Sequence, residues 1–196
     1  MTTQLLTPTL ARLPALVAAL RRGWSPDNVR GEVAAREMLE RIDADAALFI
    51  ERQTDPQALG EPLTLPDGTQ VRRLPGRTFW IWSDEEPDHG FCGSLGFRWQ
   101  PGTAALPPHV PGHVGYAVVP WQRGRGHATA ALRAVLPHAQ ELGLPWIELT
   151  TDPDNVASQK VIERAGGRLL ERFVKPAAFG GHEGLRYRIP VPPSTP

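Results

Sequence analysis

The sequence predicts an α/β protein organised around a strand, a glycine-rich turn and a helix. Residues 113–119 alternate loosely and are rich in Val and Tyr, and Pro120 ends this strand. Helical spacing of apolar residues begins at Ala128. The pattern then continues as strand, helix, strand and strand, so the order from residue 112 is β-α-β-α-β-β. The first of these helices supplies the crossover that a parallel pair of strands requires.

The turn between the strand and the helix has the chemistry of an anion site. It reads Gln-Arg-Gly-Arg-Gly-His over residues 122–127. The first N–H groups of a helix lack partners within it, and the helix dipole favours negative charge there. Gly124 and Gly126 let a phosphate approach the backbone, while Arg123 and Arg125 add charge and paired donors. A P-loop would need Gly-Lys-Ser/Thr, and a dinucleotide fingerprint would need a third glycine where Thr129 stands.

Residues 123–128 resemble the acetyl-CoA motif of the GNAT N-acetyltransferases, R/Q-x-x-G-x-G/A. The second motif of that family follows in the right order, as residues 155–158, Ile162-Glu163 and Gly166. The resemblance spans residues 90–190 and is greatest to a bacterial branch of predicted acetyltransferases with unassigned acceptors. It implies the GNAT fold, a mixed and mainly antiparallel central sheet flanked by helices. Two central strands of this fold run parallel and splay apart.

Composition sets the expected organisation and partners. Lys+Arg and Asp+Glu are 21 each, and this balance argues against nucleic acid or an anionic membrane as the main partner. The single cysteine excludes an internal disulfide and a cysteine metal cluster, so no metal is expected. No apolar run reaches the roughly 18 residues of a membrane span and no signal peptide is visible, so we expect a cytoplasmic protein.

We expect one domain over residues 9–190, between a loose tail at 1–8 and another at 191–196. Two helices are predicted within 9–45, the first ending at Gly23 and the second starting at Ser25-Pro26. The acetyl-CoA-binding core is expected at 112–170. Between these regions, 48–50 and 91–99 are predicted strands, and 69–73 with 78–83 form either a hairpin or two sheet strands. Residues 84–89 are an acidic loop, interpreted either as a solvated turn or as an attractant for a cationic amine.

After the turn, the helix is predicted to run to residue 142, with a kink or an early break at Pro137 and a cap at Gly143. A strand at 146–151, a helix at 156–165 and strands at 168–173 and 184–189 complete the chain. Asn155 is the expected N-cap of the second helix.

The resemblance implies acetyl-CoA as cosubstrate and assigns residues to it. Arg123 and Arg125 would contact the pyrophosphate, and backbone groups of Val118 and Val119 would pair with the pantetheine like an added strand. Asn155 either caps its helix only or also binds the cofactor arm, and Ser158 would face the cofactor. The phosphates would lie against the N–H groups of Gly124, Gly126, His127, Ala128 and Thr129.

The implied reaction is direct attack of a primary amine on the thioester, the amine belonging to a small molecule, a peptide or a protein N-terminus. His113 is a candidate base or a structural histidine, and Glu148 is the second candidate base. Ile162 stands where many members carry a tyrosine as general acid, so Ser158, water or an unassisted thiolate would replace it. A non-catalytic CoA-binding or sensing protein and a nucleotide-phosphate binder are the alternatives. Dimers are frequent among relatives, so a homodimer is one open assembly.

Overall fold

The computed structural model describes residues 2–65, 67–85, 90–175 and 181–193. The chain forms two compact units. Unit 1 consists of Met1–Thr54, Arg77–Gly96 and Tyr116–Ala134, and unit 2 of Asp55–Gly76, Phe97–Gly115 and Val135–Pro196. Each unit is described by itself, and a single domain over 9–190 stays a prediction. Among the described residues, no helix combines the length and the apolar character needed to cross a membrane.

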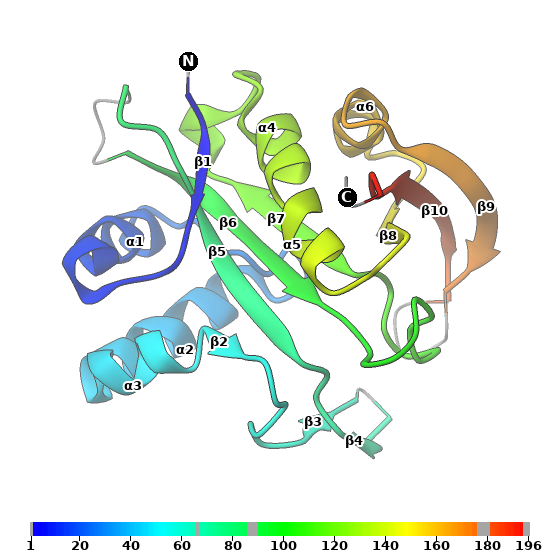
Figure 1. The fold of residues 1–196 in the computed structure, drawn as a ribbon. Coiled ribbons are helices and arrows are strands. Elements are labelled where there is room, and N and C mark those ends of the chain that lie inside the picture. Colours follow the sequence, from blue (N-terminus) through cyan, green and yellow to red (C-terminus); the bar gives the residue numbers. More distant parts are fainter. Residues whose placement is uncertain (1, 66, 86–89, 176–180, 194–196) are drawn as a thin grey trace. The chain divides into compact units, whose positions relative to one another are not determined.

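The elements of the chain are shown in Figure 1. In the first half they are β1 (Gln4–Leu6), η1 (Leu10–Arg12), α1 (Leu13–Arg21), α2 (Gly31–Ala44), α3 (Ala46–Glu51), β2 (Thr54–Asp55), β3 (Leu63–Thr64), β4 (Gln70–Val71), β5 (Gly76–Trp82) and β6 (Phe91–Arg98). In the second half they are β7 (Val114–Val118), η2 (Pro120–Gln122), α4 (His127–Ala134), α5 (Leu136–Glu141), β8 (Trp146–Thr151), α6 (Val156–Arg164), β9 (Arg168–Val174) and β10 (Glu183–Pro190).

Unit 1 is built on a sheet with the strand order β1-β5-β6-β7, in which β2 also pairs with β5. The prediction that residues 1–8 form a loose tail is wrong for residues 4–6. Residues 4–6 form β1, which pairs antiparallel with β5 and places Leu5 opposite Ile81. Apolar side chains at these positions let the strand add to the sheet, so the N-terminus is part of the fold.

The core of unit 1 lies between the sheet and the helices α1, α2 and α3. Leu16 and Leu20 on α1 and Phe49 on α3 are buried in it. Trp24 meets the ring of Phe91 edge-on, with 5.3 Å between the ring centroids. The aromatic strand β5 thus turns one face into this core, as its alternating pattern predicts.

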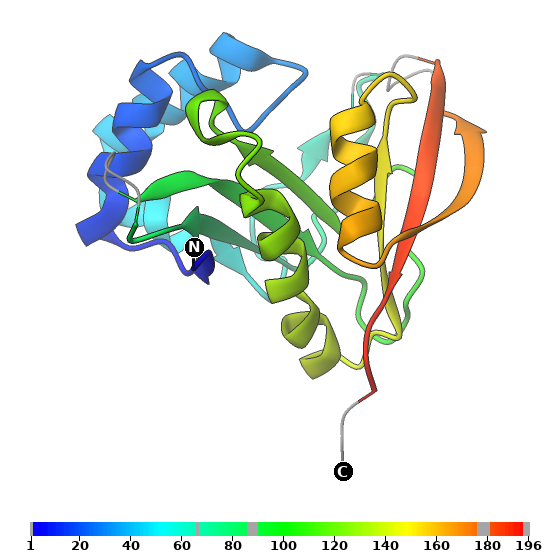
Figure 2. The same cartoon turned by 90° about the horizontal axis from the view of Figure 1, so that it is seen from above.

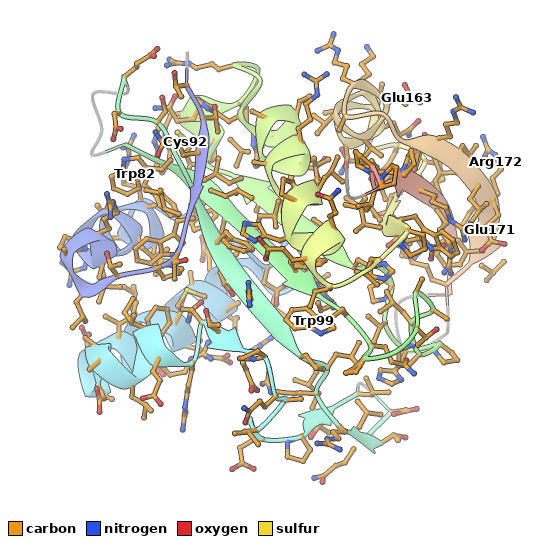
Figure 3. The ribbon with its side chains drawn as sticks, viewed as in Figure 1. Trp82, Cys92, Trp99, Glu163, Glu171 and Arg172 are labelled. Atoms are coloured by element: carbon orange, nitrogen blue, oxygen red, sulfur yellow. The ribbon has the colours of Figure 1, made fainter. Side chains whose placement is uncertain are left out.

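Unit 2 contains a second sheet with the order β8-β10-β9. β10 pairs antiparallel with both neighbours and places Tyr187 opposite Leu149 of β8. Seen from above, α6 runs alongside this sheet (Figure 2) and buries Ile162 completely. β9 is one of the two edge strands of this sheet, and it carries Glu171 and Arg172 (Figure 3). These elements match the predicted strands and helix of the second motif.

Two predicted boundaries in the first half are wrong. Residues 48–50, which were predicted as a strand, belong to helix α3. The N-cap of this helix, Asp45, accepts the N–H of Leu48. Ser25-Pro26 does not start α2, because Asp27 accepts the N–H groups of Val29 and Arg30 and forms a separate turn. Val29 therefore lies in the turn before α2 and is 94% exposed.

Of the two alternatives for residues 69–73 and 78–83, the hairpin is wrong and two sheet strands are observed. β4 pairs antiparallel with β3, placing Thr64 opposite Gln70, and β5 belongs to the larger sheet. Gly68 has a φ of 84° and donates to Leu65, which confirms the predicted turn at 66–68. Pro66 lies outside the described residues.

Several predicted stops are confirmed. β7 ends before Pro120, and the helix after the turn is broken into α4 and α5, with Pro137 in the first turn of α5. Gly143 has a φ of 69° and closes α5 through its N–H to Gln140. β8 has the predicted bounds.

Candidate functional site

The loop from Arg123 to Gly126 is exposed and precedes helix α4 in unit 1. Gly124 and Gly126 have φ values of 77° and 85°, in the region that favours glycine, and a Cβ on either would meet no atom within 4 Å. The first helical bond runs from Ala130 N–H to the Gly126 carbonyl at 3.0 Å. The N–H groups of residues 127–129 precede it and have no acceptor within the helix. The loop therefore places two exposed arginines and two glycines directly before the N-terminus of α4.

The end of β7 is tied to this loop. Arg123 Nε donates to the carbonyl oxygen of Val118 at 3.3 Å. Val119 is already engaged on both sides, because its N–H donates to Cys92 and its carbonyl accepts from Gln122, each at 3.0 Å. The Val119 N–H is therefore used within the fold, whereas its carbonyl oxygen keeps a second lone pair. Pairing of Val118 and Val119 with the pantetheine stays a prediction.

His127 contributes its backbone alone to the surface of the turn. Its side chain is buried, and its Nδ1 lies 2.9 Å from the hydroxyl of Thr3. Thr3 directly precedes β1, so the strand missed in the sequence also fixes the start of α4.

In unit 2, Asn155 is the N-cap of α6, as predicted. Its side-chain oxygen accepts the N–H of Ser158 at 3.0 Å. Ser158 lies in the first turn of α6 and is partly buried, whereas Asn155 is exposed. Whether Asn155 also meets a cofactor arm stays a prediction.

His113 and Glu148, also in unit 2, are joined by two hydrogen bonds. The N–H of His113 donates to the carbonyl oxygen of Glu148 at 2.7 Å, and the N–H of Glu148 donates to Nδ1 of His113 at 3.0 Å. Nδ1 is therefore the unprotonated nitrogen of a neutral ring, and Nε2 carries the hydrogen. His113 is completely buried, and its Nε2 has no hydrogen-bond partner among the described residues.

Burial lowers the pKa of His113 to about 4; Arg98 and Arg188 also lower it, and Glu148 acts in the opposite direction. The ring is neutral at pH 7. Its only lone pair on nitrogen is already used by the N–H of Glu148. This environment suits a hydrogen-bond donor and disfavours a base.

The Glu148 carboxylate is held by two arginines of β10. Oε1 accepts from Arg188 Nη2 at 2.6 Å and from Nε at 3.1 Å, and Oε2 lies 3.4 Å from Arg186 Nη1. The Arg188 guanidinium also lies over the ring of Trp146, 4.2 Å from its centroid. Glu148 is thus built into an ion-pair network, which disfavours its role as a free base.

The predicted site residues divide between the two units. Unit 1 holds residues 118–129, and unit 2 holds His113, Glu148, Asn155 and Ser158. The described parts of the chain contain no group of His, Cys, Asp and Glu that would hold a metal ion. Residues 86–89 of the predicted acidic loop lie outside the described residues. Asp84, before them, accepts from Trp82 Nε1 at 2.9 Å.

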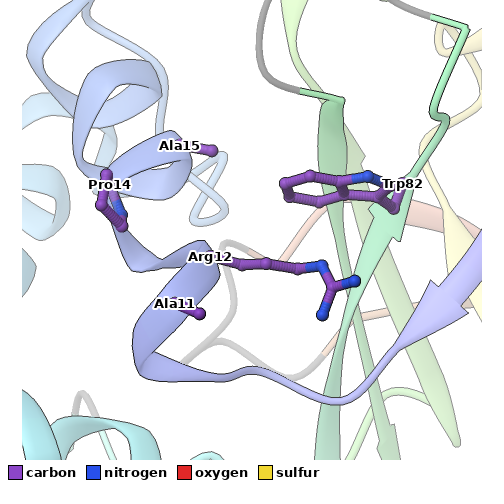
Figure 4. A pocket seen from close by; sticks show the side chains of 5 residues that line it. All are labelled: Ala11, Arg12, Pro14, Ala15 and Trp82. Carbon is purple, nitrogen blue, oxygen red and sulfur yellow. The ribbon is translucent and has the colours of Figure 1, made fainter.

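A pocket that the sequence analysis did not predict lies in unit 1, where η1 and α1 face β5 (Figure 4). Its volume is about 250 Å³. The guanidinium of Arg12 lies 5.4 Å from the ring centroid of Trp82. The lining residues are Ala11, Arg12, Pro14, Ala15 and Trp82.

Sequence reasoning also missed Arg98, at the end of β6. It is partly buried, and it makes no ion pair or side-chain hydrogen bond with any described residue. Burial lowers its pKa. The available signal was a single arginine near the end of an otherwise apolar stretch, residues 91–99.

The comparisons identify the class of protein. The family model for the acetyltransferase (GNAT) domain matches residues 34–168, more than half of the chain. The chain therefore belongs to the GNAT acetyltransferase family, as the two motifs predict. The search of curated proteins found no match.

Solved structures agree on the fold. RimL, described as a ribosomal L7/L12 alpha-N-protein acetyltransferase in complex with coenzyme A, is similar with a TM-score of 0.63 at 16% identity, over 97% of this chain and 95% of RimL. A GNAT-family acetyltransferase from Bacillus anthracis gives 0.58 at 17%, over 97% and 95%. The microcin C7 self-immunity acetyltransferase MccE, in complex with acetyl-CoA and AMP, gives 0.59 at 14%, over 96% and 92%.

The predicted GNAT fold is therefore confirmed, with antiparallel sheets and flanking helices. The sheet is less continuous than expected, because β7 and β8 belong to separate sheets. The parallel and splayed arrangement of these two strands stays a prediction.

Proposed function

We propose that this protein transfers an acetyl group from acetyl-CoA to a primary amine by direct attack. The observation that carries the proposal is the exposed Arg123–Gly126 loop at the start of α4, within a GNAT domain. RimL and MccE, which share the fold, were solved with coenzyme A and acetyl-CoA. The same cosubstrate is the simplest ligand for this loop.

The cofactor is assigned to the turn before α4 and to the start of α6. Arg123, Arg125 and the N–H groups from Gly124 to Thr129 would bind the pyrophosphate. Val118 would pair with the pantetheine, and Arg123 would then give up the Val118 carbonyl. Asn155 and Ser158, at the start of α6, are proposed for the cofactor arm. Bound acetyl-CoA supplies the activated acetyl group.

Direct attack agrees with the placement of the only cysteine. Cys92 is completely buried in β6, and its Sγ lies 3.5 Å from the Gly90 carbonyl oxygen. A buried thiol cannot reach a thioester without opening the sheet, which argues against an acetyl-cysteine intermediate.

The proton of the acceptor ammonium goes to solvent in this proposal. The ring nitrogen of His113 that could accept a proton already accepts a backbone N–H, and the Glu148 carboxylate is paired with two arginines, which disfavours its protonation. His113 instead offers its Nε2–H as a donor. Ser158 is the proposed proton donor to the departing thiolate, and Ser158→Ala is expected to lower kcat more than it raises KM.

Steady-state kinetics test the proposal. Thiol release is measured while acetyl-CoA and a panel of primary amines are varied together. Direct attack predicts intersecting double-reciprocal lines and unchanged kinetics in Cys92→Ser. Parallel lines would indicate a covalent intermediate and contradict the mechanism. Acetyl-CoA binding without turnover on any amine would favour the alternative, a CoA-binding or sensing protein. A cytoplasmic location and a homodimer stay predictions.

A further inference from the structure

Arg98 and His113 face each other across neighbouring strands in unit 2. The N–H of Arg98 donates to the His113 carbonyl at 2.8 Å, which makes the two residues direct partners between β6 and the start of β7. Directly opposed residues of an antiparallel pair place their side chains on the same face. Arg98 Nη2 lies 3.5 Å from the position of a Cβ on Gly115, the next residue of β7 on that face. The arginine therefore extends over the strand on the side of His113.

Both side chains offer donors that the protein leaves unused. The Arg98 guanidinium has no ion pair or hydrogen bond to any described residue. His113 uses Nδ1 as an acceptor, so Nε2 is a buried donor without a partner in the described structure. Leaving the buried Nε2 donor of His113 unpaired is unfavourable, and native proteins rarely do so without a functional reason. The partly buried Arg98 adds a positive charge on the same face.

Glu148, which is hydrogen-bonded to His113, is already occupied by Arg188 and Arg186 of β10. An added anion would provide an acceptor for the Arg98 guanidinium and for the Nε2–H of His113.

We infer that Arg98 and His113 form a binding site for a carboxylate carried by the acceptor. One carboxylate accepts paired bonds from a guanidinium and has lone pairs left for an imidazole N–H. The inference rests on the proposed function and narrows its acceptor to an amine that also bears a carboxylate. Such an acceptor is either a free amino acid or a peptide with an acidic residue beside its N-terminus.

The first test needs no ligand. Arg98→Met keeps most of the side-chain volume and removes the unpaired charge, so its unfolding temperature should equal or exceed that of the wild type. Arg188→Met is the matched control and should lower the unfolding temperature, because it leaves the Glu148 carboxylate without its main partner. An equal loss in both variants would show that Arg98 is a structural cation and overturn the inference.

The second test uses reaction products as probes, without any form of CoA. In the first arm, N-acetyl amino acids are compared with their carboxamides. In the second arm, N-acetyl dipeptide amides that carry Asp at the second position are compared with the same dipeptide amides carrying Asn. At least one acid should stabilise the wild type more than its amide, and the arm in which it does so identifies the free or the peptide acceptor. Arg98→Met should weaken that binding about tenfold to a hundredfold.

The carboxylate site and the proposed function can be overturned independently of each other. Equal effects of acids and amides across the panel, or full retention of acid binding in Arg98→Met, would overturn the carboxylate site even if acetyl-CoA binds. Failure of acetyl-CoA to bind would overturn the proposed function, and that result is read from a different titration.

Discussion

The Glu148 backbone N–H donates to His113 Nδ1 at 3.0 Å, and the His113 N–H donates to the Glu148 carbonyl at 2.7 Å. A histidine side chain thus takes the place of a backbone acceptor where the chain entering β7 meets β8. The bond fixes the tautomer and holds the ring in a fully buried position. This contact sets the tautomer of His113 and leaves Nε2–H as its donor, and predictions below depend on it.

His113 makes stability depend on pH. Its pKa is about 4 in the folded protein and near 6.5 when unfolded. Between these values the unfolded chain binds the proton and the folded chain does not, so stability falls as the pH drops from 6.5 towards 4. The loss reaches about 3 kcal/mol at the lower end. Urea unfolding from pH 4.5 to 7.5 measures it.

His113→Asn is the matched control for this titration. The amide oxygen of asparagine can accept the Glu148 N–H but does not titrate, so the variant should show a shallower slope over the same pH range. Identical slopes in both proteins would show that His113 is not the titrating group.

Gly112 permits the close approach of the chain to β8. A Cβ on it would lie 2.7 Å from the Glu148 carbonyl oxygen and 3.1 Å from Leu149 Cα, and both are backbone atoms. Gly112→Ala should therefore cost about 1–3 kcal/mol of stability. Gly115→Ala is the comparison, because its nearest neighbour is Arg98 Nη2 at 3.5 Å, an ordinary contact at the end of a flexible side chain. Denaturant unfolding that finds the two variants equally stable would contradict this account.

We expect Glu148 to contribute to stability through its ion pairs with Arg188 and Arg186. Glu148→Gln should cost about 1–3 kcal/mol of stability, because it leaves the Arg188 guanidinium without its carboxylate. A double-mutant cycle with Arg188→Met should give a coupling energy that accounts for most of that loss. A variant of unchanged stability whose kcat/KM falls more than a hundredfold would restore the base assignment.

The pH profile of acetyl transfer tests whether a residue with a pKa near neutrality accepts the proton of the amine. With the amine proton lost to solvent, kcat/KM should rise tenfold per pH unit towards the pKa of the amine, which is about 7.7–8.0 for the α-amino group of a peptide and about 10.4 for an alkylamine. His113→Asn should keep that slope. A plateau with an apparent pKa between 6 and 7 that disappears in His113→Asn would show that the histidine does take the proton.

The sequence predicted the second half of the chain well because its signals are local. Pro120, Pro137 and Gly143 end elements through their own backbone chemistry, and Asn155 caps α6 through a contact three residues away. Each of these features needs no knowledge of distant parts of the chain.

The errors lie where distant contacts decide the structure. β1 is a strand because residues 4–6 pair with β5, and β4 pairs with β3 instead of forming a hairpin with β5. Burial keeps His113 neutral, and the N–H of Glu148, 35 residues away in the chain, sets its tautomer. Such relations follow from the fold and not from the spacing of residues.

The central claim is that the Arg123–Gly126 loop binds acetyl-CoA, and thermal unfolding tests it most directly. Acetyl-CoA, free CoA and ATP are compared on the wild type, on Arg125→Ala and on Arg36→Ala, a control that removes an exposed cation from α2. Ligand at 100 times its Kd adds about 2.7 kcal/mol, which is roughly 5–10 °C for a chain of this length. We predict this shift with acetyl-CoA and CoA, little shift with ATP, a weaker shift in Arg125→Ala and a full shift in Arg36→Ala. No shift at millimolar acetyl-CoA, or an equal shift with ATP, would contradict the assignment of this loop to the cofactor.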